Sequence, residues 1–150
     1  MAASGQGPRA RKPSDSEGCK DCDVQIEPYS PHHAAGIAQL CCDLEWLSYA
    51  DVDVAARGCS APGVVVRVAV DEGNRVVGFA QVMGDGVVQS FLAQLAVAAT
   101  HRRRGIARAL LRDAFDASGT DRMDLITDDA EEFYRSFPHK TKAGFRIYPS

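Results

Sequence analysis

The segment Arg102-Arg103-Arg104-Gly105-Ile106-Ala107 places three guanidinium groups and a glycine where an apolar strand pattern gives way to a helical one. The first N–H groups of a helix have no partner within it and lie at the positive end of the helix dipole, so they attract an anion. Gly105 lets the backbone approach a phosphate closely, and the arginines add charged donors. The segment predicts a phosphate-binding site, and its alternative interpretation is a solvated basic turn.

A second group of residues, Ala130-Glu131-Glu132-Phe133-Tyr134, falls on a short predicted helix nearer the C-terminus. Tyr134 is its candidate for chemistry, because a positioned phenol can give a proton to a leaving group. A tyrosine on an amphipathic helix is also a common packing residue. The role of Tyr134 therefore depends on what lies near it.

The composition is that of an ordinary globular protein: 150 residues, 45% hydrophobic and 25% charged, with a net charge of −3. No apolar run approaches the roughly 20 residues of a membrane helix, and the net charge argues against binding to nucleic acid. We therefore expect neither a membrane nor a nucleic acid as partner. The N-terminus has no apolar core of a secretory signal, which predicts a cytoplasmic protein.

Five cysteines, Cys19, Cys22, Cys41, Cys42 and Cys59, make an odd number that suits reduced thiols better than a disulfide framework. Cys19 and Cys22, with His32 and His33 downstream, could supply zinc ligands. Their spacing fits no common zinc site, so we predict no metal.

Residues 1–22 are rich in Gly, Ser, Pro and charge, which predicts a flexible tail before a folded domain at 23–150. Periodicity predicts strands at 24–26, 64–70, 75–83, 87–97, 123–127 and 145–148, and helices opening near His32 and covering 46–57, 106–118 and 128–137. Turns at 71–74 and 84–86 make the central strands an antiparallel meander. The expected fold class is α/β (α+β), with a mixed, mostly antiparallel sheet flanked by helices.

The arginine segment resembles the acetyl-CoA signature of the GNAT superfamily of N-acetyltransferases, (Gln/Arg)-x-x-Gly-x-(Gly/Ala). Leu95-Ala96-Val97 resembles the family strand whose backbone binds the pantetheine arm. Ala130 to Tyr134, followed by Gly144-Phe145, is similar to the family's Ala-x-x-Phe-Tyr and Gly-Phe segments. The order strand, two helices, three strands, helix, strand, helix, strand also resembles the GNAT fold over most of the chain.

This resemblance implies an enzyme that moves an acetyl group from acetyl-CoA to a primary amine by direct attack, with Tyr134 as the general acid. The acceptor would be a small-molecule or peptide amine, and the acidic and aromatic residues of 43–53 lie in the stretch that lines the acceptor site in relatives. The resemblance assigns cofactor binding to Leu95, Ala96, Val97, Arg102, Arg103, Arg104, Gly105, Ile106, Ala107 and Arg108.

Three features of the sequence depart from the family pattern: two residues and the short stretch that follows 145–148. Thr127 replaces a frequent asparagine, and Gln94 replaces a strand carboxylate, which leaves Asp85, Glu45 or a water chain as candidates for the base. The missing carboxylate supports an alternative, a non-catalytic acyl-CoA binding module. Little sequence follows 145–148, so the acceptor side would be open or completed by a second subunit in a homodimer.

Overall fold

The computed structural model describes residues 23–150, so the predicted tail and the Cys19/Cys22 pair lie outside the described residues. The helices and strands run in the following order: β1 (Gln25–Pro28), a 3-10 turn (Pro31–His33), α1 (Ala34–Asp43), a 3-10 turn (Leu47–Tyr49), α2 (Val52–Cys59), β2 (Val64–Val70), β3 (Val76–Gly84), β4 (Gln89–Val97), a 3-10 turn (Ala99–His101), α3 (Ile106–Ser118), β5 (Arg122–Asp124) and α4 (Glu131–Arg135). No helix in this part of the chain combines the length and apolar character that crossing a membrane requires.

The five strands form one sheet in the order β1-β2-β3-β4-β5. The first four are antiparallel neighbours, whereas β5 pairs with β4 in parallel after the crossover through α3. That parallel pairing covers only Gln89 to Phe91 of β4. A bulge follows, because Gln81 of β3 pairs with Gln94 while Val82 pairs with Leu92. Among residues 23–150, no strand pairs with the second half of β4 on its β5 side.

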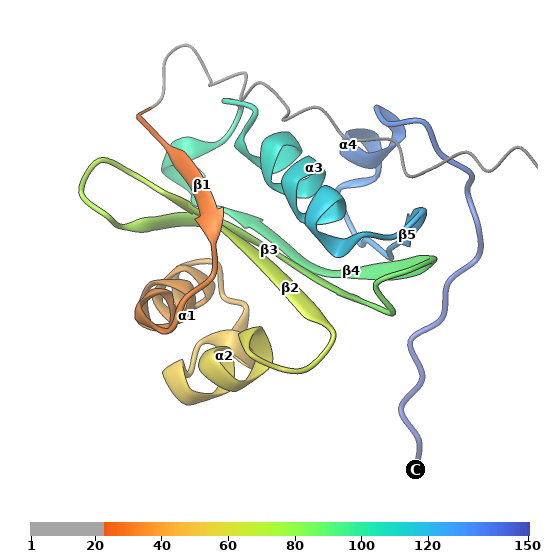
Figure 1. Ribbon diagram of the computed structural model, residues 1–150, viewed down its shortest axis with the longest axis horizontal. Coiled ribbons are helices and arrows are strands. Elements are labelled where there is room, and N and C mark those ends of the chain that lie inside the picture. Colours follow the sequence, from red (N-terminus) through yellow and green to blue (C-terminus); the bar gives the residue numbers. More distant parts are fainter. Residues whose placement is uncertain (1–22) are drawn as a thin grey trace, which may run out of the picture.

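Helices cover both faces of the sheet, with α1 and α2 on one face and α3 and α4 on the other (Figure 1). The first core lies between α1, α2 and the sheet, and Ile37, Cys41 and Phe79 are fully buried in it. The second core lies between α3 and the sheet, around Leu110 and Ala114. Two layers of apolar packing thus hold β4 at a fixed place between the two helical faces.

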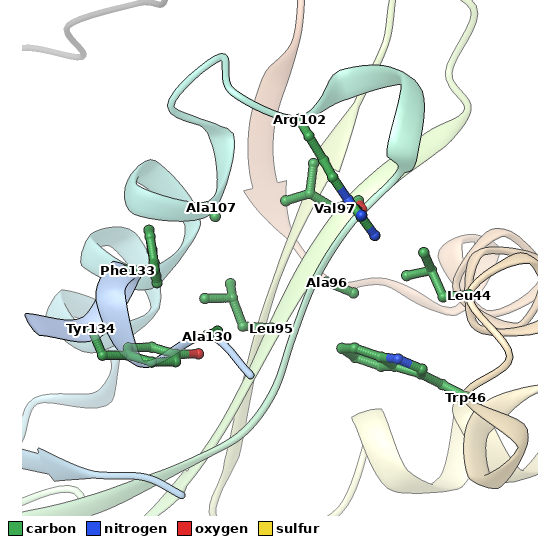
Figure 2. Close-up of a pocket in the computed structure, with 10 residues that line it drawn as sticks. All are labelled: Leu44, Trp46, Leu95, Ala96, Val97, Arg102, Ala107, Ala130, Phe133 and Tyr134. Atoms are coloured by element: carbon green, nitrogen blue, oxygen red, sulfur yellow. The ribbon is translucent and has the colours of Figure 1, made fainter. Parts of the chain in front are cut away.

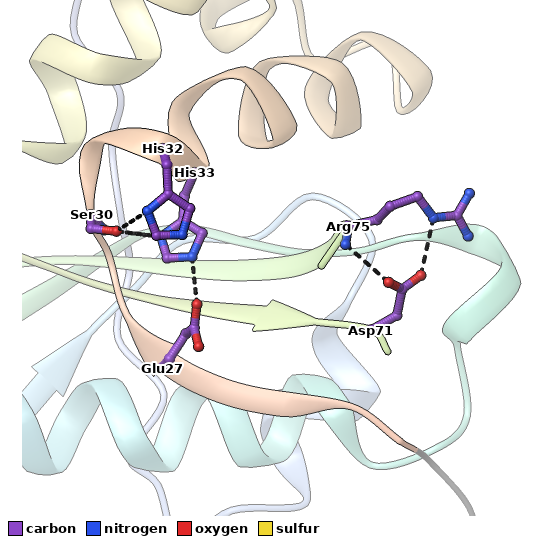
Figure 3. Close-up of polar contacts among 6 residues, drawn as sticks. All are labelled: Glu27, Ser30, His32, His33, Asp71 and Arg75. Atoms are coloured by element: carbon purple, nitrogen blue, oxygen red, sulfur yellow. Dashed lines mark hydrogen bonds and ion pairs between the residues drawn. The ribbon is translucent and has the colours of Figure 1, made fainter. Parts of the chain in front are cut away.

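Polar contacts fix the loop that follows β1 and the turn between β2 and β3 (Figure 3). The Ser30 amide donates to Nδ1 of the buried His33 at 2.9 Å, and Nε2 of His33 lies 2.6 Å from Oε1 of Glu27. This capping box joins β1 to α1. In the β2–β3 turn, Asp71 accepts from the backbone amides of Gly73 and Arg75, both at 2.9 Å. These bonds hold the pKa of Asp71 below its usual range.

The predicted fold class is confirmed, and β2 has the predicted bounds. The predicted strand at residues 145–148 is wrong: no described strand pairs with this segment, and its apolar side chains are exposed. The helix predicted at 128–137 is restricted to α4, because the residues before it form a loop in which Thr127 Oγ1 accepts from the Ala130 amide at 3.1 Å. The helical stretch at 46–57 is divided, since Asp51 caps a new helix through the Val54 amide at 3.0 Å.

Candidate active site

The junction between β4 and α3 has the backbone geometry of an anion site. Arg103 and Gly105 adopt positive φ angles of 62° and 77°, which turn the chain into the first residue of α3. Gly105 is the N-cap residue and has no side chain to bond the amides of the first turn. Those amides, at the positive end of a 13-residue helix, are therefore available to a ligand.

The four arginines near this junction differ in their contacts and in their distance from the start of α3. Arg102 lies beside the end of β4, with Nε 3.5 Å from the Val97 carbonyl oxygen, and Arg103 and Arg104 are exposed. Arg108, one turn into α3, donates to Oγ of Ser136 at 2.5 Å, and its guanidinium carbon lies 4.2 Å from the centroid of the Phe137 ring. Arg108 thus joins α3 to the end of α4, and its predicted role in cofactor binding stays a prediction.

A pocket of about 220 Å³ opens beside the half of β4 that lacks a described strand on its β5 side (Figure 2). Its walls come from both helical faces of the molecule: Leu44, Trp46, Leu95, Ala96, Val97, Arg102, Ala107, Ala130, Phe133 and Tyr134. The structure therefore brings Tyr134 together with the predicted strand segment 95–97 and with two residues of the arginine segment. The walls are mostly apolar, and none of these side chains is a carboxylate.

Tyr134 reaches the pocket from α4 and is half-buried against the second core. Its ring packs edge-on against Phe133, with the centroids 5.0 Å apart, and Figure 2 shows its hydroxyl directed into the pocket. Burial raises the pKa of Tyr134 above its usual range, because the low-dielectric surroundings disfavour the phenolate. The phenol therefore stays protonated at neutral pH, as a proton donor must.

The family is identified by a match between this sequence and a family sequence model. A sequence model described as the acetyltransferase (GNAT) domain matches residues 62–137, which contain the β4–α3 junction and Tyr134. The chain belongs to the GNAT family of acetyltransferases. Members of this family use acetyl-CoA as the acyl donor.

Solved structures share the fold of this acetyltransferase over 85% of its length. An acetyltransferase from Trypanosoma brucei is 18% identical, with 100% of that chain covered and a TM-score of 0.69. The aminoglycoside acetyltransferase AAC(6')-Iy, in complex with a CoA bisubstrate analogue of acetylneamine, is 16% identical over 97% of that chain, with a TM-score of 0.67. An aminoglycoside acetyltransferase from an uncultured soil metagenomic sample, in complex with sisomicin, is 18% identical over 96% of that chain, with a TM-score of 0.67. No curated protein sequence matches this chain.

Neither carboxylate proposed as a base, Asp85 or Glu45, lines the pocket, although Glu45 is exposed between the lining residues Leu44 and Trp46. Gln94 pairs with Gln81 across the bulge, and Gln81 is buried, with Nε2 donating to the Gly58 carbonyl at 3.1 Å. Asp85 accepts from the amides of Val87, Val88 and Gln89 in the β3–β4 turn, and these bonds lower its pKa. Asp85 thus stabilises a turn, which makes it a poor general base.

Among the acidic and aromatic residues of 43–53, one lines the pocket and several have structural contacts. Trp46 lines the pocket. Asp43 accepts from Gln39 at 2.8 Å, Asp51 caps α2, and Tyr49 packs on the first core. Leu44, which also lines the pocket, was missed by sequence reasoning, because its helical spacing indicated only a buried face.

Glu27, His32 and His33 place three potential metal-ligand atoms within 4.8 Å of one another. The Ser30 amide donates to Nδ1 of His33, so the ring proton of neutral His33 is on Nε2, facing Glu27. A metal bound at Nε2 would have to displace that proton and break the Ser30 bond. The hydrogen bonds therefore favour a structural cap over a metal site.

Proposed function

We propose that this GNAT protein transfers the acetyl group of acetyl-CoA to a primary amine by direct attack, with Tyr134 as the general acid. The observation that carries the proposal is the position of Tyr134, which shares one pocket with the second half of β4 and with Ala107 in the first turn of α3. A thioester held there would have its anionic end at the arginines and its reactive end near the phenol.

The donor substrate would be held mainly by backbone groups. The diphosphate of CoA would accept hydrogen bonds from the first-turn amides of α3, after Gly105, with Arg102 to Arg104 adding positive charge. The pantetheine arm would lie along Leu95 to Val97, where β4 has no neighbouring strand in the described structure to occupy its outer edge. Ala107 lines this route, and its small side chain leaves space for the ligand.

The reaction would proceed in one transfer step. The lone pair of a neutral amine forms a C–N bond with the thioester carbonyl carbon, and the C–S bond breaks. Tyr134 gives its proton to the departing sulfur, while backbone N–H groups near 95–97 stabilise the negative charge that builds on the carbonyl oxygen. Because no lining residue is a carboxylate, the amine would lose its proton to water, which Gln94 could help to orient.

The acceptor amine would enter from the side of Trp46, opposite the helix that carries Tyr134. An aromatic ring in this position suits a cationic or apolar amine, and small-molecule and peptide amines both fit this chemistry. The aminoglycoside enzymes among the structural neighbours support a small-molecule acceptor.

A thiol-release assay with acetyl-CoA and a panel of amines tests the proposal. An enzyme releases free CoA thiol only when an acceptor is present. An acyl-CoA binding module without turnover, the alternative favoured by Gln94, would instead be stabilised by acetyl-CoA, by about 2.7 kcal/mol at a hundred times its dissociation constant, and would release no thiol. Absence of binding by calorimetry would reject both.

A further inference from the structure

The side-chain oxygen of Gln81, on β3, is buried and has no hydrogen-bond partner among the described residues. The whole residue is 2% exposed, and its amide nitrogen donates to the Gly58 carbonyl at 3.1 Å. This bond fixes the orientation of the Gln81 amide, because the nitrogen must face α2. A buried carbonyl oxygen without a donor is unfavourable, so a nearby donor is expected to reach it.

The carbonyl that holds Gln81 belongs to a tightly packed part of α2. Gly58 lies in the last turn of this helix, where carbonyl groups have no partner within the helix. A Cβ built on Gly58 would lie 2.8 Å from Cε1 of Tyr49, so the helix backbone is in direct contact with the Tyr49 ring. Gln81 therefore has one structural role, which is to satisfy the end of α2 through its nitrogen. Its oxygen is not needed for that role.

The side chain of Gln94, on β4, lies beside this oxygen. Gln94 is directly opposite Gln81 in the antiparallel ladder, and opposed residues present their side chains to the same face. The opposed pair Phe79 and Ala96, two residues along, likewise shares the first core. The Cβ atoms of such pairs are about 4.5–5.5 Å apart, within reach of two glutamine side chains. The last torsion of a glutamine has broad minima, so the Gln94 amide can turn its NH2 group to Gln81 Oε1.

Gln94 also lies at the margin of the pocket. It is half-buried and immediately precedes the lining residues 95–97. Its side chain is on the same face of β4 as that of Ala96, which lines the pocket and packs in the core that Leu44 also contacts. Gln94 is therefore on the Trp46 side of the pocket, where we propose that the acceptor amine enters.

We infer that Gln81 is a positioning residue for acetyl transfer and acts by setting the orientation of the Gln94 amide. The Gln94 NH2 group donates to Gln81 Oε1, so the Gln94 carbonyl oxygen faces the pocket. There it accepts an N–H of the acceptor amine and leaves the nitrogen lone pair free to attack the thioester. The opposite orientation would present the NH2 group, which would donate to that lone pair and oppose attack. The inference rests on the proposed function.

A double-mutant cycle with Gln81→Met and Gln94→Met tests this coupling. Each single variant should lower kcat/KM for the acceptor about tenfold, the scale of one hydrogen bond, and leave the affinity for acetyl-CoA unchanged. In the Gln94→Met background, Gln81→Met should cause no further loss, because its effect passes through Gln94. If Gln81 served only to cap α2, the two losses would multiply, which would overturn the inference. Gln25→Met, at an exposed site on β1, is the matched control and should change neither constant.

Hydrogen exchange of side-chain amides, followed by NMR, tests the inference in the parent protein. This measurement remains valid if Gln81→Met fails to fold for lack of its bond to Gly58. The Gln94 NH2 signal, assigned by its loss in Gln94→Met, should exchange about tenfold more slowly than that of the exposed Gln25, and a folded Gln81→Met should lose this protection. If no amine yields free thiol, the proposed function fails. If thiol is released but Gln94 and Gln25 exchange at equal rates, only this inference fails.

Discussion

Trp46 and Tyr134 face one pocket from opposite layers of the molecule, Trp46 from the segment between α1 and α2 and Tyr134 from α4 (Figure 2). The second half of β4 passes between them, with Leu95 and Ala96 in the pocket wall. This arrangement exists because β5 leaves β4 after Phe91. The short parallel pairing therefore creates the opening beside β4 that we propose as the transfer site.

Replacing Tyr134 by phenylalanine removes the proposed proton donor and keeps the ring that packs on Phe133. We expect turnover to fall by about two orders of magnitude, because general acid catalysis contributes on that scale, while the affinity for acetyl-CoA stays near that of the parent protein. Tyr148→Phe, at a site 81% exposed, is the control. Equal turnover of the two variants would remove Tyr134 from the mechanism.

The raised pKa of Tyr134 predicts how activity depends on pH. Burial disfavours the phenolate, so the alkaline loss of kcat caused by deprotonation should lie above about pH 10, the usual pKa of tyrosine. The same pKa shift makes the stability of the fold depend on pH. The contribution of Tyr134 to the free energy of unfolding is fully present below its pKa in the unfolded chain, and it is lost as the pH rises through the higher pKa of the folded state. The titration of Tyr134 is identified by comparing the tyrosinate absorbance of the parent protein and of Tyr134→Phe as the pH is raised. An ionisation of Tyr134 below that of an ordinary tyrosine would contradict this prediction.

The two positive-φ glycines at the ends of α3 allow a matched test of the anion site. Gly105→Ala and Gly119→Ala place a Cβ at φ angles of 77° and 70°, and each should cost about 1 kcal/mol of stability. Only Gly105 lies where the diphosphate is expected. Calorimetry should show roughly tenfold weaker CoA binding for Gly105→Ala and unchanged binding for Gly119→Ala. Equal affinities would place the diphosphate elsewhere.

Features set by local sequence could be predicted. The β2 strand is a run of branched apolar residues between turn signals, and its bounds match. Gly105 and Gly119 mark the ends of α3, because each position requires a left-handed backbone. The arginine segment and Tyr134 could be proposed as a site because each is a short motif, although their meeting in one pocket depends on the whole fold.

Features that depend on distant partners could not be predicted. The alternation at residues 145–148 is typical of a strand, but a strand also needs a neighbour, and the described structure provides none. Leu44 lies far from Tyr134 in sequence, so no periodicity could place it in the same pocket, and Trp46 could be placed near the acceptor only through the family resemblance. Arg108 has the charge of a phosphate ligand, yet its contacts with Ser136 and Phe137 follow from the docking of α4.

The cysteines of the first core should differ from their exposed neighbour in reactivity. Burial raises the pKa of Cys41 and of Cys59 to about 11, with a smaller effect of Cys41 on Cys59, whereas Cys42 is exposed. At pH 8 roughly one buried thiol in a thousand would be a thiolate. Maleimide labelling mapped by mass spectrometry should therefore modify Cys42 in the native protein, and Cys41 and Cys59 only after unfolding. Rapid native labelling of Cys41 would contradict the packing of α1.

Trp46 tests which side of the pocket receives the amine. Trp46→Ala should lower kcat/KM for the acceptor about tenfold, because the ring would no longer cover the amine. The affinity for CoA should change little, since we propose that the diphosphate binds at the start of α3. Leu47→Ala, next to it but outside the pocket lining, should leave both constants unchanged. If Trp46→Ala weakened CoA binding and spared acceptor kinetics, the tryptophan would belong to the donor side and the acceptor would have to enter elsewhere.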